Sequence, residues 1–102
     1  MEYEIHKTLV ASTAHITGED NDQLIHDTDT NLTANLIVYR YGDYGYIIFI
    51  PEIEEPDTKE AIAEVYSESF RKLMDITREQ ECIYLRVDYD GPIYGNLPTY
   101  EW

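Results

Sequence analysis

Apolar and polar residues alternate along residues 82–89, and this period of two predicts a β-strand. Two other segments, 36–41 and 44–50, are apolar over most of their length and flank a glycine–aspartate turn, so they predict a hairpin of two strands. A shorter apolar segment at 5–11 predicts a further strand near the start. The pattern therefore indicates four strands, of which the hairpin strands are the most apolar.

A period of three and four residues replaces the alternation at 58–80, where it predicts one long helix with Asp57 as its N-cap. The apolar positions of this helix form a single stripe: Ile62, Val65, Tyr66, Phe70, Leu73 and Met74. Thr17 followed by a glycine and two acids predicts a second, shorter helix at 18–26, because acids in the first turn are stabilised by the helix dipole. The polar segment 27–35 predicts a loop.

In chain order the predicted elements are β-α-β-β-α-β, which is the order of the ferredoxin-like fold. We therefore expect an α+β protein with a four-stranded antiparallel sheet and two helices on one face. The length of 102 residues, without a linker rich in Pro, Gly or Ser, predicts a single domain over residues 1–102. Leu97, Tyr100 and Trp102 make the last residues too apolar for a disordered tail, so the indole of Trp102 is expected to pack against the sheet and the C-terminal segment to be fixed.

The chain carries 21 acidic and 7 basic residues, which gives a formal net charge of −14. Two segments hold most of the excess: 18–31 has five acids and no lysine or arginine, and 51–68 has seven acids and one lysine. Because 43% of the residues are hydrophobic, we expect a folded rather than a disordered chain. A field of this sign repels nucleic acid and anionic membranes and attracts basic protein surfaces, so neither nucleic acid nor a membrane is an expected direct partner.

Cysteine content and hydropathy bear on the location of the protein. Cys82 is the single cysteine, which excludes an intrachain disulfide, and the acidic first residues do not resemble a secretory signal. The longest apolar run is far shorter than the roughly 20 residues that span a bilayer. We therefore expect a cytoplasmic protein in which Cys82 is a small core residue.

The segment from Ser12 to His15 follows the first predicted strand, where active-site residues of α/β folds often lie. With Asp88 and Asp90, at the end of the last strand, these residues could line a pocket for a small ligand or a hydrolytic reaction. The glycine-flanked turn that presents a nucleophilic serine is absent from the sequence, which argues against hydrolysis. The alternative is that Ser12 bonds backbone groups at the strand end and His15 makes a structural hydrogen bond.

Several side chains could in principle ligate a metal ion: His6, His15, His26, Asp88 and Asp90. Their spacing matches no metal-binding motif. The segment 27–31 begins like an EF-hand loop but lacks the glycine and the closing glutamate of that loop. The sequence therefore predicts neither a metal ion nor a cofactor.

Tyrosine is the second compositional feature, with ten in the chain, most of them within 39–46 and 84–100. Aromatic rings beside carboxylates suit arginine-rich partners, because arginine stacks on rings and pairs with acids. Packing within an aromatic sheet explains the tyrosines equally well. A stacking platform for nucleic-acid bases would need a basic groove, and the sequence provides none.

Two segments at the ends of the chain carry a family resemblance. Residues 12–17 read Ser-Thr-Ala-His-Ile-Thr, and Asp-Tyr-Asp-Gly-Pro at 88–92 leads to Leu-Pro-Thr-Tyr-Glu-Trp at 97–102. Both segments resemble a family of small, uncharacterised bacterial and phage domains of unknown function. The resemblance implies no reaction. It implies a setting among genes of phages and mobile elements, where small acidic proteins often counter host defence.

Charge and resemblance together favour a non-enzymatic interaction protein. We expect its carboxylates to imitate nucleic-acid phosphates and to occupy the basic surface of a host nucleic-acid-binding protein, as an inhibitor of CRISPR or restriction systems would. The expected partner-binding residues are Glu52, Glu54, Glu55, Glu60, Glu64 and Glu68. The alternative hypothesis is a small ligand-binding domain or enzyme with a pocket around Ser12, His15 and Asp90.

Overall fold

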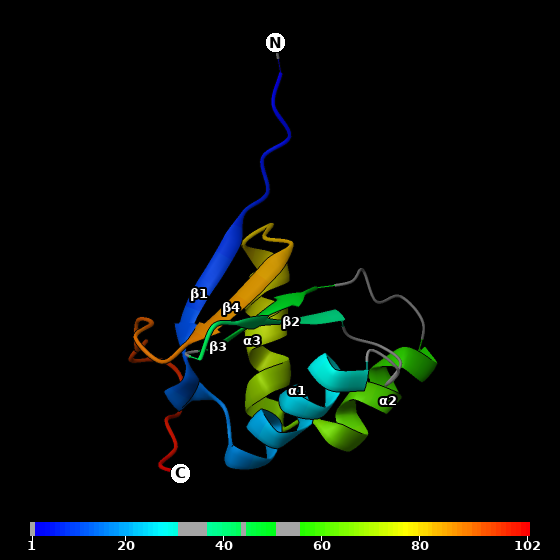
Figure 1. The fold of residues 1–102 in the computed structure, drawn as a ribbon, viewed down its shortest axis with the longest axis vertical. Coiled ribbons are helices and arrows are strands. Elements are labelled where there is room, and N and C mark those ends of the chain that lie inside the picture. Colours follow the sequence, from blue (N-terminus) through cyan, green and yellow to red (C-terminus); the bar gives the residue numbers. More distant parts are fainter. Residues whose placement is uncertain (1, 31–36, 44, 51–55) are drawn as a thin grey trace.

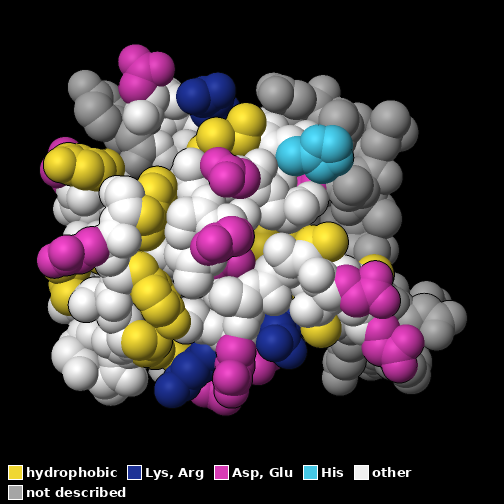
Figure 2. Space-filling model, turned by 90° about the horizontal axis from the view of Figure 1, so that it is seen from below, with side chains coloured by type: hydrophobic (Ala, Val, Ile, Leu, Met, Phe, Trp, Pro, Cys, Tyr) yellow, Lys and Arg dark blue, Asp and Glu magenta, His cyan; other side chains and the backbone are white. Residues whose placement is uncertain are grey.

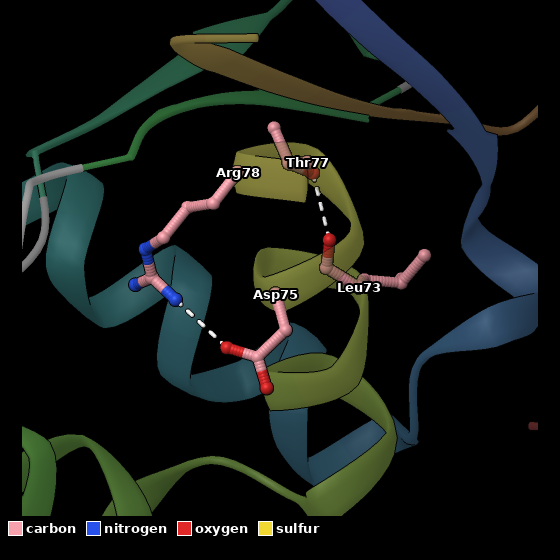
Figure 3. A network of polar contacts seen from close by, with 4 residues as sticks. All are labelled: Leu73, Asp75, Thr77 and Arg78. Atoms are coloured by element: carbon pink, nitrogen blue, oxygen red, sulfur yellow. Dashed lines mark hydrogen bonds and ion pairs between the residues drawn. The ribbon is translucent and has the colours of Figure 1, made fainter. Parts of the chain in front are cut away.

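The structure is a computed structural model that describes residues 2–30, 37–43, 45–50 and 56–102. Its elements are, in order, β1 (Thr8–Ser12), the 3-10 helix η1 (Thr13–His15), α1 (Gly18–Thr30), β2 (Ile37–Tyr41), β3 (Gly45–Phe49), α2 (Pro56–Val65), α3 (Glu68–Glu79) and β4 (Tyr84–Asp88). The four strands form one sheet, and the three α-helices lie on the same side of it (Figures 1 and 3). The predicted α+β class and all four predicted strands are confirmed.

The strand order is β1-β4-β3-β2, and this corrects the predicted ferredoxin-like antiparallel sheet. β1 pairs in parallel with β4, in a register that runs from Thr8↔Tyr84 to Ser12↔Asp88, whereas β4–β3 and β3–β2 are antiparallel. β1 is therefore an edge strand and β4 is central. Alternation reveals that a strand exists but not which neighbour it pairs with, because the hydrogen-bonding edges of a strand carry no side-chain signal.

The long helix predicted at 58–80 is two helices. α2 begins at Pro56, a residue suited to the first helical position, so Asp57 lies inside the helix and is not its N-cap. α3 begins after Ser67, whose backbone is extended and whose hydroxyl accepts a hydrogen bond from the Phe70 N–H at 3.1 Å. The break moves Val65 to the surface, where 45% of it is exposed, although the predicted stripe included it.

α1 is longer than predicted, since it continues past residue 26 to Thr30. Part of the predicted loop at 27–35 is therefore helical, and residues 31–35 of it lie outside the described residues. The last turn of α1 contains aspartates and threonines, which favour turns in isolation. The sequence pattern therefore predicts the end of this helix too early.

The core lies between the helices and the sheet. The sheet contributes alternate positions in register, with Val38 opposite Ile48 and Ile48 opposite Leu85, and all three are buried. The helices contribute the rest of the predicted stripe, together with one residue of α1; these are Leu24, Ile62, Tyr66, Phe70, Leu73 and Met74. In the described part of the chain no helix covers the other face of the sheet (Figure 1), which presents half-buried and exposed rings.

α3 divides clearly into a buried and an exposed side. Thr77 is fully buried on the side that faces the sheet, and its hydroxyl is satisfied by donation to the Leu73 carbonyl at 2.7 Å (Figure 3). Asp75 and Arg78 form an ion pair at 2.8 Å on the more exposed side. A single polar residue in the apolar stripe is thus tolerated because its hydroxyl has an intrahelical acceptor.

The C-terminal segment after β4 has no regular structure but is bonded to the start of the domain. Ser12 N–H donates to the Pro92 carbonyl at 2.9 Å, and Tyr100 N–H donates to the Ala14 carbonyl at 2.8 Å. Trp102 donates from Nε1 to the Ile16 carbonyl at 2.9 Å, and its ring lies over Gly18. The expected packing of Trp102 on the sheet is wrong: the residue lies at the start of α1 and is 59% exposed.

Candidate functional site

The predicted acidic surface lies partly on α2 and α3. Glu60 and Glu64 are exposed and one turn apart on α2, and Glu68 is exposed in the first turn of α3. None of these three carboxylates makes an ion pair with another described residue. The remaining predicted partner-binding residues, Glu52, Glu54 and Glu55, lie outside the described residues.

Figure 2 shows the end of the molecule at which α1, α2 and the C-terminal segment lie. Acidic side chains are spread across this view, from its left edge to its lower right, while basic side chains occur near its upper and lower margins. Exposed acids of α1, Glu19 and Asp22, add to the same negative charge. This distribution gives the described part of the helical layer a negative surface potential.

Two acids of α1 do not belong to that surface. Asp20 is 1% exposed and Asp27 is 2% exposed, so the acidic segment at 18–31 contributes fewer surface charges than its composition indicates. The two residues are seven positions apart, which places them on one face of the helix two turns from each other. That face packs towards the junction between α2 and α3, where both side chains find partners.

Asp20 joins two helix starts. It forms a capping box with Thr17, in which each side chain accepts from the backbone N–H of the other, at 3.0 and 3.1 Å. It also accepts from the N–H of Ser67 at 2.8 Å and from the hydroxyl of Ser67 at 2.5 Å. The buried carboxylate thereby accepts hydrogen bonds from three donors, one at the start of α1 and two at the start of α3, which identifies a structural role.

Asp27 accepts a hydrogen bond from the hydroxyl of Tyr66 and another from Gln23 Nε2 at 3.1 Å. Burial of the Tyr66 ring, followed by its hydrogen bond to Asp27 and the charges of both aspartates, raises the pKa of the Tyr66 hydroxyl far above its ordinary value. The hydroxyl therefore stays protonated and acts as a donor. The buried contacts of Asp20 and Asp27 were not predicted from the sequence. Their spacing was a usable signal, because Asp20 lies three residues after Thr17, as in a capping box, and Asp27 lies on the same helix face as Asp20.

His15, proposed above for a pocket, is 1% exposed, and both of its ring nitrogens are hydrogen-bonded to backbone groups. Nε2 accepts from the N–H of Tyr94 at 2.9 Å, so Nδ1 carries the proton and donates to the Pro98 carbonyl at 2.8 Å. The Tyr94 ring is stacked on the imidazole at a centroid distance of 6.0 Å. His15 thus holds the C-terminal segment against η1, and a general base would need a free nitrogen.

The other residues of the candidate pocket are brought near one another at the ends of the paired strands β1 and β4. Ser12 is opposite Asp88 in the register, and its hydroxyl accepts from the Ala14 N–H at 3.1 Å as the N-cap of η1. Asp88 accepts from the Asp90 N–H at 3.0 Å in the turn after β4. Among the described residues, no hydrogen bond links His15 to Ser12, Asp88 or Asp90.

Neither a metal site nor a membrane span is found in the described residues. Within 2–30, 37–43, 45–50 and 56–102, no three side chains of His, Cys, Asp or Glu are grouped so that they could hold a metal ion. No helix of the described part of the chain is both long enough and apolar enough to cross a bilayer. Residues 27–30, which resemble the start of an EF-hand loop, are helical.

The fold and these contacts define a small acidic α+β domain whose buried polar groups serve helix starts and the C-terminal segment. The chain belongs to a family of unknown function, DUF5983: the sequence model of the C-terminal domain of that family matches residues 8–102. The resemblance to a domain family of unknown function is thereby confirmed. No curated protein and no solved structure shows significant similarity to the chain.

Proposed function

We propose that this domain is a non-enzymatic interaction module that binds a basic protein surface through the acidic helical surface formed by Glu60, Glu64 and Glu68. The observation that carries the proposal is that these three carboxylates are exposed and unpaired among the described residues of a chain with a net charge of −14. Regular helices hold the three acids, so the backbone that carries them is already ordered before binding.

The spacing of the acids supports a nucleic-acid-binding protein as the partner. Glu60 and Glu64 are separated by about 6 Å along the axis of α2, which is close to the advance of two phosphates along one DNA strand, about 7 Å. Glu68 adds a third exposed carboxylate in the first turn of α3, and Glu52, Glu54 and Glu55 remain part of the proposed binding set. A domain of this kind would occupy the nucleic-acid site of its partner, and the phage-like resemblance makes a host defence protein the first candidate.

The alternative, a ligand pocket or enzyme around Ser12, His15 and Asp90, has less support. The imidazole has no free nitrogen, and the Ser12 hydroxyl already serves as a helix cap. Opening that region would break the contacts that hold the C-terminal segment.

The proposal is tested with the variant Glu60→Gln, Glu64→Gln, Glu68→Gln. The immobilised wild-type domain should retain a basic nucleic-acid-binding protein from bacterial lysate at 50 mM but not at 500 mM NaCl, and duplex DNA should release it, because both compete for one basic surface. We expect the triple variant to weaken the affinity for the retained protein roughly tenfold without lowering Tm, because each exposed charge contributes modestly to binding and none of the three carboxylates is held by another described residue in an ion pair that stabilises the fold. Titration calorimetry measures the affinity.

The matched control is Glu2→Gln, Glu4→Gln, Glu79→Gln, which removes the same number of exposed charges elsewhere. It should retain most of the affinity. An equal loss in both triple variants would show that net charge alone acts and would overturn the assignment of the site. Retention that duplex DNA does not release would overturn mimicry.

A further inference from the structure

A cavity of about 340 Å³ lies at the outer edge of the sheet, on the β1 side. Leu9 of β1, Leu73 and Ile76 of α3, and Leu97 of the C-terminal segment line it. Its volume is at the lower end of the range for small-molecule sites, about 300–1,000 Å³, and such sites have predominantly apolar walls with a few polar groups. It shares no residue with the acidic helical surface, so a ligand in this cavity would be independent of the proposed function.

Among the described residues, one charged group lines this cavity, and it is a cation. Lys7 Nζ donates to the carbonyl of Gln80, at the C-terminal end of α3, at 2.8 Å. The Lys7 carbonyl accepts from the N–H groups of Ile83 and Tyr84, so the backbone of this lysine is fixed beside β4. An ammonium group has three donors, and Gln80 uses one. The others are available to an oxygen of a ligand.

The cysteine of the chain is at the same place. Cys82 lines the cavity and is half-buried, with its Sγ 3.7 Å from the Gln80 carbonyl. The sequence analysis expected Cys82 to be a core residue; instead it lies in the cavity wall, where a small reagent reaches it and a ligand would cover it. Its reaction with a neutral alkylating reagent therefore reports on occupancy.

We propose that this cavity binds an aliphatic carboxylate, with the apolar chain between Leu9, Leu73 and Leu97 and the carboxylate on Lys7. The apolar walls supply the favourable burial, and the position of Lys7 selects the head group. In a protein with a net charge of −14, a cation is the one charged group that the described residues place in the cavity wall, and this indicates an anionic rather than a cationic ligand.

The test uses decanoate, decylamine and decanol as probes below their aggregation concentrations. We expect decanoate to slow the alkylation of Cys82 by iodoacetamide at least fivefold at saturation, and decylamine to have no such effect. Calorimetry gives the affinities. Absence of decanoate binding up to millimolar concentration would overturn the proposal, as would equal protection by decylamine.

Two lysine variants separate the head-group contact from general charge effects. Lys7→Met keeps the aliphatic stem and should weaken decanoate binding about fivefold while leaving decanol unchanged, whereas Lys7→Arg should preserve both. Lys72→Met, at an exposed position of α3 outside the cavity, is the matched control and should change neither. Decanol binding as tightly as decanoate, with no effect of Lys7→Met, would overturn the carboxylate assignment and indicate an uncharged apolar occupant.

A cavity-filling variant completes the test. Ile76→Trp should abolish protection of Cys82 by decanoate, because the larger ring occupies the space between α3 and β1. Its Tm establishes that the domain is folded. Protection that persists in a folded Ile76→Trp variant would place the ligand elsewhere and overturn the proposal.

Discussion

At the scale of single residues, the buried polar side chains of this domain hold the ends of helices together. Asp20 and Asp27 are removed from water on one face of α1, and a buried carboxylate is stable only where donors surround it. Ser67 supplies two donors to Asp20, and the Tyr66 hydroxyl supplies one to Asp27. These neighbouring residues lie at the break between α2 and α3, so the break itself is fixed by α1.

Tyr66→Phe tests this arrangement at neutral pH. The change leaves a buried carboxylate without one of its donors, and we expect the free energy of unfolding to fall by about 1–3 kcal/mol. Urea unfolding at pH 7 measures it. Tyr89→Phe, at an exposed tyrosine, is the control and should change stability by less than about 0.5 kcal/mol. Equal effects of the two variants would show that the hydrogen bond to Asp27 contributes nothing.

The raised pKa of Tyr66 adds a dependence on pH. In the unfolded chain a tyrosine ionises near pH 10, whereas in the folded protein this hydroxyl keeps its proton well above that pH. Its contribution is complete below pH 10 and is lost above it, by up to about 1.4 kcal/mol per pH unit, because the unfolded state then binds fewer protons. The stability difference between wild type and Tyr66→Phe should therefore narrow between pH 9 and pH 11. A constant difference would contradict the origin assigned here.

At the scale of elements, the strands and the buried stripe follow from the apolar pattern, whereas strand order and helix ends do not. The central strand β4 alternates strictly and was predicted within two residues of each end. β1 has three apolar residues, Leu9 to Ala11, and these do not indicate that the strand pairs with β4 or that the pairing is parallel. The helix break at Ser67 depends on hydrogen bonds to the distant Asp20, so the local spacing of apolar residues at intervals of three and four does not predict it.

Two apolar residues of the predicted stripe differ in burial, so their truncation to alanine should have different effects on stability. Phe70 is fully buried and its ring is stacked on Tyr66 at 4.4 Å between centroids, so Phe70→Ala should lower the free energy of unfolding by about 3–5 kcal/mol. Val65 ends α2 and is nearly half-exposed, so Val65→Ala should cost less than about 0.5 kcal/mol. Thermal and urea unfolding measure both. Similar losses would mean that the stripe runs unbroken and that α2 and α3 are one helix.

At the scale of the molecule, the sequence predicts the negative charge of the surface better than the positions of cavities and buried polar contacts. The exposure of Glu60, Glu64 and Glu68 follows from their positions between apolar residues of the helix pattern. A structural hydrogen bond of His15 was one of the two expectations from the sequence and is confirmed, but its partners could not be predicted, because Tyr94 and Pro98 are about 80 residues away and contribute backbone atoms. The cavity beside Lys7 likewise forms from three separated segments and has no local signature.

The net charge of the domain should make its thermal stability depend on salt concentration. Fourteen excess negative charges repel one another in the compact state, and few of the acids in the described residues are ion-paired. Salt screens this repulsion, so Tm should rise by about 5 °C between 20 and 500 mM NaCl, which corresponds to about 1 kcal/mol for a domain of this size. Differential scanning calorimetry measures the change.

The variant Glu60→Gln, Glu64→Gln, Glu68→Gln links this measurement to function. If these acids lower the stability of the free domain, the variant has a higher Tm than wild type at 20 mM NaCl and a smaller rise with salt. Acids that destabilise the free fold are expected where a surface serves binding, since a stabilising substitution is then functionally costly. A Tm that falls in the variant at low salt would show that the carboxylates stabilise the fold by attraction, and it would remove this support for a binding surface on α2 and α3.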